Sequence, residues 1–149
     1  MVISFCGHSS YVAKNVDEQM ILDILQTEIG NEKCEIFLGG YGNFDSFAYS
    51  CAKKFKAANP NVKLIFITPY RDEKYIKEKM YGRDEIDEIV YPPLEHVPLR
   101  YAISRRNRWI VEHSDIIIAY ISHAYGGAYE TYKFATKKNV KVFNVCESF

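Results

Sequence analysis

Arg106 is the side chain of this sequence best placed to hold an anion. It falls on the apolar stripe of a predicted helix, between Ala102 and Ile110, where an unpaired charge would be costly. Its partner is therefore a carboxylate or a phosphate, and we favour ligand contact over a purely structural ion pair. Arg105 and Arg108 point elsewhere around the helix and are expected to lie near water.

Glu130 is the candidate for catalysis. It follows the turn Gly126-Gly127 within the first turn of a predicted helix, where it could serve as acid, base or nucleophile beside a bound sugar. The helix dipole and a surface partner in Lys133 explain a carboxylate at this position equally well. Both interpretations stay open.

A second glycine turn, Gly39-Gly40-Tyr41-Gly42, could bring backbone N–H groups to phosphate oxygens. The alternative is a tight turn that needs glycine dihedrals only, and the turn alone does not decide between them. The sequence has neither the GxGxxG dinucleotide fingerprint nor a GxxxxGK[ST] P-loop. Neither NAD(P) redox chemistry nor ATP hydrolysis is indicated, and no cofactor is expected.

Two histidines, His8 and His123, each end a predicted strand and could meet over a common site, with Asp45 nearby. No HxxH or CxxC spacing accompanies them, so we expect hydrogen bonding to a ligand or loop and no metal centre. Several aromatic side chains near loops could stack on a base, but none stands out: Tyr11, Tyr41, Phe44, Tyr70 and Tyr125.

Strands and helices alternate along the whole chain. Apolar runs predict strands at 2–5, 34–38, 62–68, 116–120 and 140–145, with a further strand possible at 86–91. A capping box at Asn15 and Glu18 predicts one helix start, and Pro98 predicts another. We therefore expect one α/β domain over residues 1–149, a Rossmann-like three-layer fold with a mainly parallel sheet.

In such sheets ligands bind beyond the carboxyl ends of the strands. Four strand ends and the segments after them should converge there, and the predicted helix from Pro98 adds Asn107 beside Arg106. The predicted ligand-binding residues are Gly7, His8, Ser9, Gly39, Gly40, Gly42, Phe44, Asp45, Pro69, Tyr70, Arg71, Asn107, Ser122, His123, Gly126 and Gly127.

The amino-acid composition limits the classes of binding partner that we expect. The 149 residues carry 19 basic and 19 acidic side chains, so strong indiscriminate binding to nucleic acid or lipid is not suggested. No apolar run could span a membrane, and no secretory leader is evident. The four scattered cysteines are expected to be buried free thiols, which fits a cytoplasmic protein. The aromatic content, 15%, suggests a homo-oligomer.

Several segments together resemble a known family. FCGHSS, FLGGYGNFDSFA, IFITPYRDE, RRNRWIVEHSDIIIAY and GGAYETYKFATKKNVKVFNV occur in the order found in the YpsA-like branch of the SLOG superfamily. The RNRxxVxxSD segment is the most specific of them. The resemblance covers almost the whole chain, and it implies a Rossmann-like domain that binds nucleotides or nucleotide-derived ligands.

Two related enzyme families share part of this pattern. In LOG-type phosphoribohydrolases an arginine precedes an aspartate by the interval that separates Arg106 from Asp115, and a catalytic glutamate follows the last glycine as Glu130 follows Gly127. Nucleoside deoxyribosyltransferases also place a glutamate after such a turn. The chain departs from the phosphoribohydrolases at Ala128, where they have threonine, and the loop before the glycines looks longer.

The favoured function is therefore binding of a nucleotide or an ADP-ribose-like ligand at the sheet edge, as a sensor or sequestering protein. The alternative is an N-glycosidic-bond hydrolase or transferase acting on nucleoside monophosphates, in which Glu130 is catalytic and Arg106 holds phosphate. Single-stranded DNA binding, as in the related DprA proteins, is the least expected function, because the net charge is zero and the sequence shows no basic stripe interleaved with aromatic residues.

Overall fold

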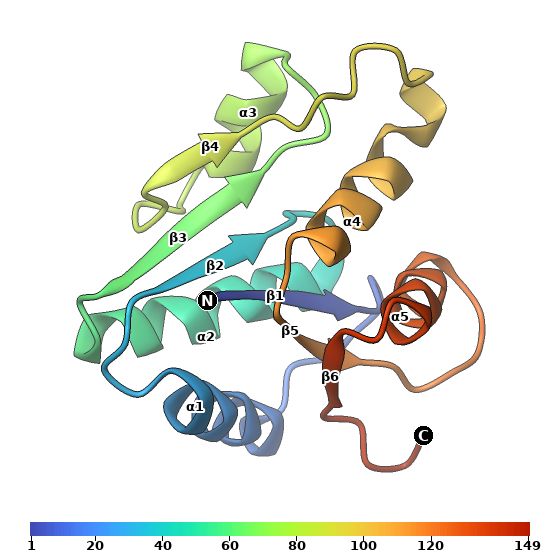
Figure 1. Ribbon diagram of the computed structural model, residues 1–149. Helices are drawn as coiled ribbons and strands as arrows, with labels where there is room; N and C mark the ends of the chain where they lie inside the picture. Colours follow the sequence, from blue (N-terminus) through green and yellow to red (C-terminus); the bar gives the residue numbers. More distant parts are fainter.

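All six strands of the chain run parallel in one sheet. The computed structural model describes residues 1–149, and the sheet order is β4-β3-β2-β1-β5-β6 (Figure 1). The strands are β1 (Val2–Gly7), β2 (Cys34–Leu38), β3 (Val62–Ile67), β4 (Glu88–Val90), β5 (Ile116–Tyr120) and β6 (Lys141–Asn144).

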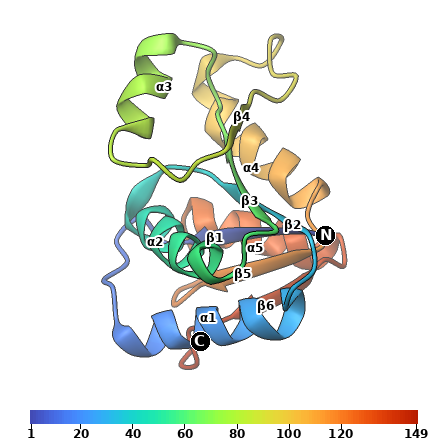
Figure 2. The same ribbon diagram turned by 90° about the vertical axis from the view of Figure 1, so that its left-hand side faces the viewer.

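The helices cover both faces of this sheet. They are α1 (Asn15–Ile29), α2 (Gly42–Ala58), α3 (Glu73–Met80), α4 (Ala102–Glu112) and α5 (Gly127–Lys137), with a short 3-10 turn, η1 (Leu99–Tyr101), before α4. The pair α1 and α2 packs on one face and the pair α4 and α5 on the other, while α3 lies toward the β4 edge of the sheet (Figures 1 and 2). The predicted Rossmann-like α/β fold with a parallel sheet is confirmed.

The core is largest between the sheet and the pair α1 and α2. There Ile3 and Ile36 of the sheet pack with Ile21, Leu25 and Phe44, all essentially without solvent exposure. Burying one such side chain contributes about 1.5–3 kcal/mol. Two smaller apolar clusters lie apart from this core: one joins β5 to α4 and α5, and the other joins β2 and β3 to Ile110 of α4.

Several predicted element ends were wrong. No capping box forms, because α1 begins at Asn15 itself and Lys14 precedes it in an extended conformation with no side-chain cap. The helix predicted from Pro98 starts instead as η1, and α4 proper begins at Ala102. The strand predicted over 86–91 shrinks to β4, three residues on the sheet edge with two of them exposed.

The order in which strands are added to the sheet reverses at β1. Successive strands run outward from β1 to β4, and the chain then returns to place β5 on the other side of β1, where Gly7 pairs with Tyr120. A crevice at the carboxyl ends of two such strands is the usual ligand site in this class of fold. None of the helices is long and apolar enough to cross a membrane, and all four cysteines are buried and unbonded.

Candidate functional site

A cavity of about 350 Å³ lies at this reversal point, between the carboxyl end of β1 and the helices α4 and α5. We call it the edge cavity. Ten of the eighteen predicted site residues line it: Gly7, His8, Ser9, Gly39, Asp45, Arg106, Asn107, His123, Gly126 and Gly127. Its size lies within the range of small-molecule sites in proteins.

Arg106 forms one wall of the edge cavity and is 1% exposed. Its Nη1 donates to the carbonyl oxygens of Gly39 at 2.6 Å and Ile67 at 2.8 Å, and its Nε donates to Oδ1 of Asn107 at 2.9 Å. These bonds tie α4 to the ends of β2 and β3. Nη2 makes no hydrogen bond within the protein, so one edge of the guanidinium remains available to a ligand.

Asp45 supplies a negative charge to the same cavity. Its Oδ2 accepts from the backbone N–H of Tyr41 at 2.7 Å, and the carboxyl lies near Arg106 without forming a direct ion pair. Burial raises the pKa of Asp45 to about 6, against the opposing effects of the Tyr41 amide and Arg106. Burial also lowers the pKa of Arg106. The cavity is therefore close to balanced in charge.

Packing accounts for two of the glycines in the turn before α2. A Cβ on Gly40 would come within 2.8 Å of the Phe66 ring, and one on Gly42 within 2.7 Å of Ser9. Both residues also have positive φ values, 79° and 86°, which disfavour other residues. The N–H of Asn43 donates to the carbonyl of Ser9. The geometry thus supports the tight-turn interpretation over a phosphate cradle.

The two predicted histidines do meet. Their rings stack at 3.6 Å between centroids, and Tyr125 continues the stack on His123 at 3.8 Å. Nε2 of His8 accepts from the backbone N–H of Ser122 at 3.0 Å, and burial followed by the nearby His123 lowers the pKa of His8. Tyr125 is 69% exposed, so the stack ends in an aromatic face open to solvent.

His123 carries the one buried side-chain polar atom of the protein that lacks a hydrogen-bond partner, its Nδ1. An unpaired buried polar atom costs about 1–3 kcal/mol. Such atoms are uncommon in folded proteins, and a role in catalysis or in binding an ion or water is one reason for them. Because His123 also lines the edge cavity, this atom is a candidate ligand contact.

Eight predicted site residues do not line the edge cavity. Phe44 is 0% exposed within the core, so its side chain is not open to a ligand in this structure. Glu130 lies outside, with its side chain 67% exposed and paired with Lys133 at 3.3 Å. The remaining six are Gly40, Gly42, Pro69, Tyr70, Arg71 and Ser122.

Residues within β1 and on α4 that were not among the predicted site residues also line the edge cavity. Cys6 is one, but its Sγ donates to the carbonyl of Ala128 at 3.1 Å, and burial raises the pKa of the thiol to about 12. It is therefore no nucleophile at neutral pH. Ile103 and Ile110 form an apolar wall, which follows from the same helical stripe that carries Arg106.

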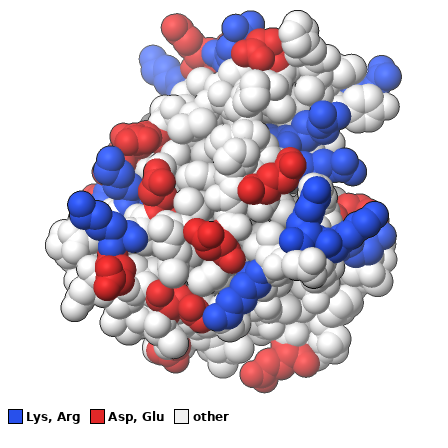
Figure 3. Space-filling view, viewed as in Figure 1, with Lys and Arg blue, Asp and Glu red and all other residues white.

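A second hollow, of about 800 Å³, lies on the outer side of α4, between it and α5. We call it the α4–α5 groove. It is lined by two acidic side chains, Glu112 and Glu130, and by five basic ones: Arg105, Arg108, Lys133, Lys137 and Lys138. Figure 3 shows Lys and Arg side chains gathered over these two helices.

Comparison with known proteins identifies the fold. No sequence family and no curated protein matches the chain. The X-ray structure of DNA processing protein A (DprA) from Streptococcus pneumoniae matches with a TM-score of 0.64 at 18% identity, over 95% of this chain and 49% of that one. DprA from Helicobacter pylori, described by its single-stranded DNA binding mode, matches with a TM-score of 0.65 at 16% identity, over 97% and 64%.

The chain thus spans about half to two thirds of the length of these DprA chains. The likeness shows a shared Rossmann-like fold. It does not single out the YpsA-like branch.

The expected ligand is corrected by this comparison. We predicted a free nucleotide or ADP-ribose-like molecule and an unlikely role for nucleic acid, but the proteins of this fold found here process DNA, and one is described by single-stranded DNA binding. Zero net charge does not by itself exclude a nucleic-acid partner, because it sums over the whole surface. Positive charge is instead concentrated in the α4–α5 groove.

Proposed function

We propose that the chain binds single-stranded DNA at the carboxyl edge of the sheet, with one nucleotide of the strand at the edge cavity. The observation that carries this proposal is the stack of His8, His123 and Tyr125, which ends in an exposed aromatic face beside that cavity. Stacking of bases on aromatic side chains is the common sequence-tolerant contact of proteins that bind single strands. The fold shared with a DprA described by such binding supports the same ligand.

The charge balance of the edge cavity favours a base over a phosphate inside it. Arg106 and Asp45 offset each other, so a phosphate would gain little attraction there. The free Nη2 of Arg106, the amide of Asn107 and Nδ1 of His123 instead offer a mixed set of polar groups. Such a set suits the donor and acceptor edge of an unpaired base.

Single strands should be preferred to duplexes for a steric reason. The face of Tyr125 can cover a base only when that base is not already stacked between neighbours in a helix. The cavity of about 350 Å³ opens at the sheet edge and has no room for a base pair flanked by two backbones. We therefore expect a duplex of the same sequence to compete poorly.

The test is fluorescence anisotropy with a labelled 20-nucleotide thymidine strand. Tyr125→Ala should weaken binding by roughly 5- to 150-fold, since base stacking on an aromatic ring contributes about 1–3 kcal/mol. Tyr81→Ala is the matched control, because Tyr81 is 89% exposed and follows α3, away from the cavity. It should bind like the unaltered protein.

Equal affinity of the two variants would contradict the proposed site. Equal competition by unlabelled duplex and by unlabelled single strand would contradict the proposed ligand. Thermal melting of both variants checks that the fold is retained, which is expected because both tyrosines are largely exposed.

Three finer assignments stay predictions. The motifs RNRxxVxxSD and GGAYE support a place in the YpsA-like branch, and the aromatic content supports a homo-oligomer. A cytoplasmic location rests on the composition and the cysteines. The catalytic role predicted for Glu130 has no geometric support, because this side chain does not line the edge cavity.

A further inference from the structure

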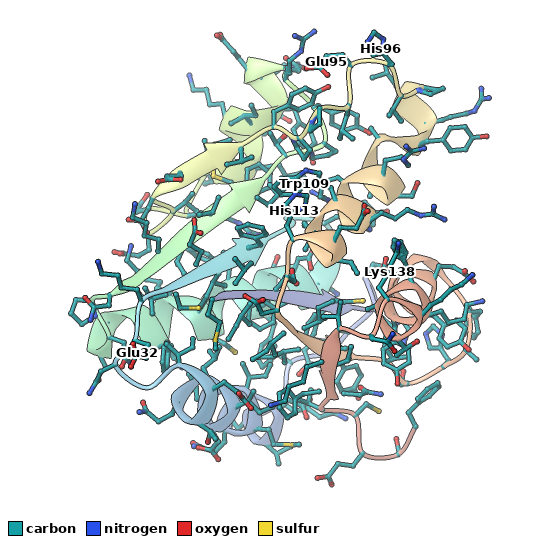
Figure 4. All side chains as sticks on the ribbon, viewed as in Figure 1. Glu32, Glu95, His96, Trp109, His113 and Lys138 are labelled. Atoms are coloured by element: carbon teal, nitrogen blue, oxygen red, sulfur yellow. The ribbon has the colours of Figure 1, made fainter.

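The α4–α5 groove has the composition of a surface that grips a polyanion. Figure 4 shows Trp109 on α4 and Lys138 beyond the end of α5, and the five basic side chains of the groove come from these two segments. Arg105 and Arg108 stand three residues apart on one helix, and Lys133 and Lys137 stand four apart on the other. These spacings place each pair on one side of its helix, turned toward the same groove.

Little of this positive charge is neutralised within the protein. Lys133 pairs with Glu130, but both are well exposed, and such a pair contributes at most about 1 kcal/mol. Arg105 and Lys137 form no ion pair. With five basic and two acidic side chains in the groove, the rest of a neutral chain has an acidic excess. A polyanion is therefore attracted to this groove and repelled from the remaining surface.

Aromatic rings are interleaved with these charges. The guanidinium of Arg108 lies 5.1 Å from the Phe134 ring centre, and Nζ of Lys138 lies 5.4 Å from it. Trp109 stacks on Phe37 and on His113, with ring centres 5.8 Å and 4.0 Å apart. The packing of the rings holds the cations in place, so less side-chain entropy is lost when they meet phosphates.

The groove and the edge cavity connect around α4. A third hollow of about 590 Å³ shares Arg105, Arg108, Glu130 and Phe134 with the groove, and it shares residues that include Asn107 and Thr131 with the edge cavity. The three hollows are therefore neighbours, arranged from the sheet edge to the outer side of the two helices. A strand with one base at the edge cavity can therefore continue into the groove.

We propose that the α4–α5 groove is a second nucleic-acid contact that binds the sugar–phosphate backbone of the same single strand. This inference rests on the proposed function and assigns a division of labour within it. The edge cavity takes a base, and the groove takes the phosphates next to it without regard to sequence.

The test is the salt dependence of binding to the same thymidine strand for the double variant Arg105→Ala/Lys137→Ala. Each phosphate contact to a single strand adds about 0.7 to the slope of log affinity against log salt, so the slope should fall by about 1.4. Tyr125→Ala should weaken binding and leave the slope unchanged, because stacking releases no counterions. Lys33→Ala/Lys53→Ala is the matched control, since it removes two exposed, unpaired charges away from both helices.

The outcomes separate the two proposals. If the groove variant binds like the unaltered protein while Tyr125→Ala is weakened, the groove inference fails and the proposed function stands. If the slope of log affinity against log salt falls equally in both double variants, the salt dependence reflects net charge alone, and the groove inference fails as well. If the unaltered protein does not bind the strand at all, both proposals fail.

Discussion

The two sides of α4 use charge in opposite ways. On the inner side Arg106 is buried, and its hydrogen bonds run to carbonyl groups of its own protein, with Asp45 nearby. On the outer side Arg105 and Arg108 are exposed, and no acidic side chain holds them. A buried charge is hydrogen-bonded within the protein and so stabilises the fold, because leaving it unpaired would be costly. A charge that is exposed costs the fold little and is free to meet a partner.

The largest expected effect tests the inner side of this comparison. Arg106→Ala should lower the free energy of unfolding by about 3–5 kcal/mol, because two carbonyls lose a charged donor and a cavity opens. Urea denaturation followed by the fluorescence of Trp109 measures it. Arg105→Ala should change the same quantity by less than about 0.5 kcal/mol.

Arg106→Lys keeps the charge and one donor group, and it should fall between these values. A loss of less than about 1 kcal/mol in Arg106→Ala would show that the inner charge is not structural. The proposed difference between a stabilising inner charge and free outer charges on α4 would then be contradicted.

The next effect concerns the turn that carries the carbonyl group of Gly39. Gly42→Ala should cost about 2–4 kcal/mol, from strain at a positive φ and from a clash with Ser9. Gly82→Ala is matched for backbone conformation, with a φ of 74°, but a Cβ there meets nothing within 4 Å. It should cost only about 1–2 kcal/mol. Equal losses would mean that packing beside the cavity plays no part.

A smaller effect is expected for the dependence of stability on pH. The pKa of Asp45 is raised by folding to about 6 from an ordinary value of 3.8. Its neutral form is thus favoured in the folded state, and that stabilising contribution is complete below pH 3.8 and lost as pH rises through about 6.

Relative to Asp45→Asn, which cannot ionise, the unaltered protein should therefore lose about 2–3 kcal/mol of stability between about pH 4 and about pH 7. Urea denaturation at a series of pH values measures this difference. A constant difference across that range would show that the inner carboxylate titrates as it would in water.

The regular elements were predictable because their signals are local. The run Ile116–Tyr120 is a continuous apolar segment between polar residues, and both β5 and the start of α5 at Gly127 lie where the sequence indicates. Element ends such as η1 were less predictable, because they depend on how the chain meets its neighbours.

The candidate site was only partly predictable. The meeting of His8 and His123 follows from their places at strand ends, and it was anticipated. The carbonyl partners of Arg106 could not be read from the sequence, since they lie 67 and 39 residues away. The α4–α5 groove was missed because it forms only when the outer faces of two helices on either side of β5 pack together, while the total charge conceals it.

Because Arg106 bonds to the ends of two strands, it also fixes the distance between the α4–α5 groove and the edge cavity. Sliding α4 along the sheet would break both bonds to Gly39 and Ile67, so the helix is anchored at a fixed position. Arg105 and Arg108 stand on the same helix, and their distance from the edge cavity is thereby constant. A single strand bound at both places must span this distance with a whole number of nucleotides. The affinity of oligonucleotides too short to span it would come from only one of the two contacts.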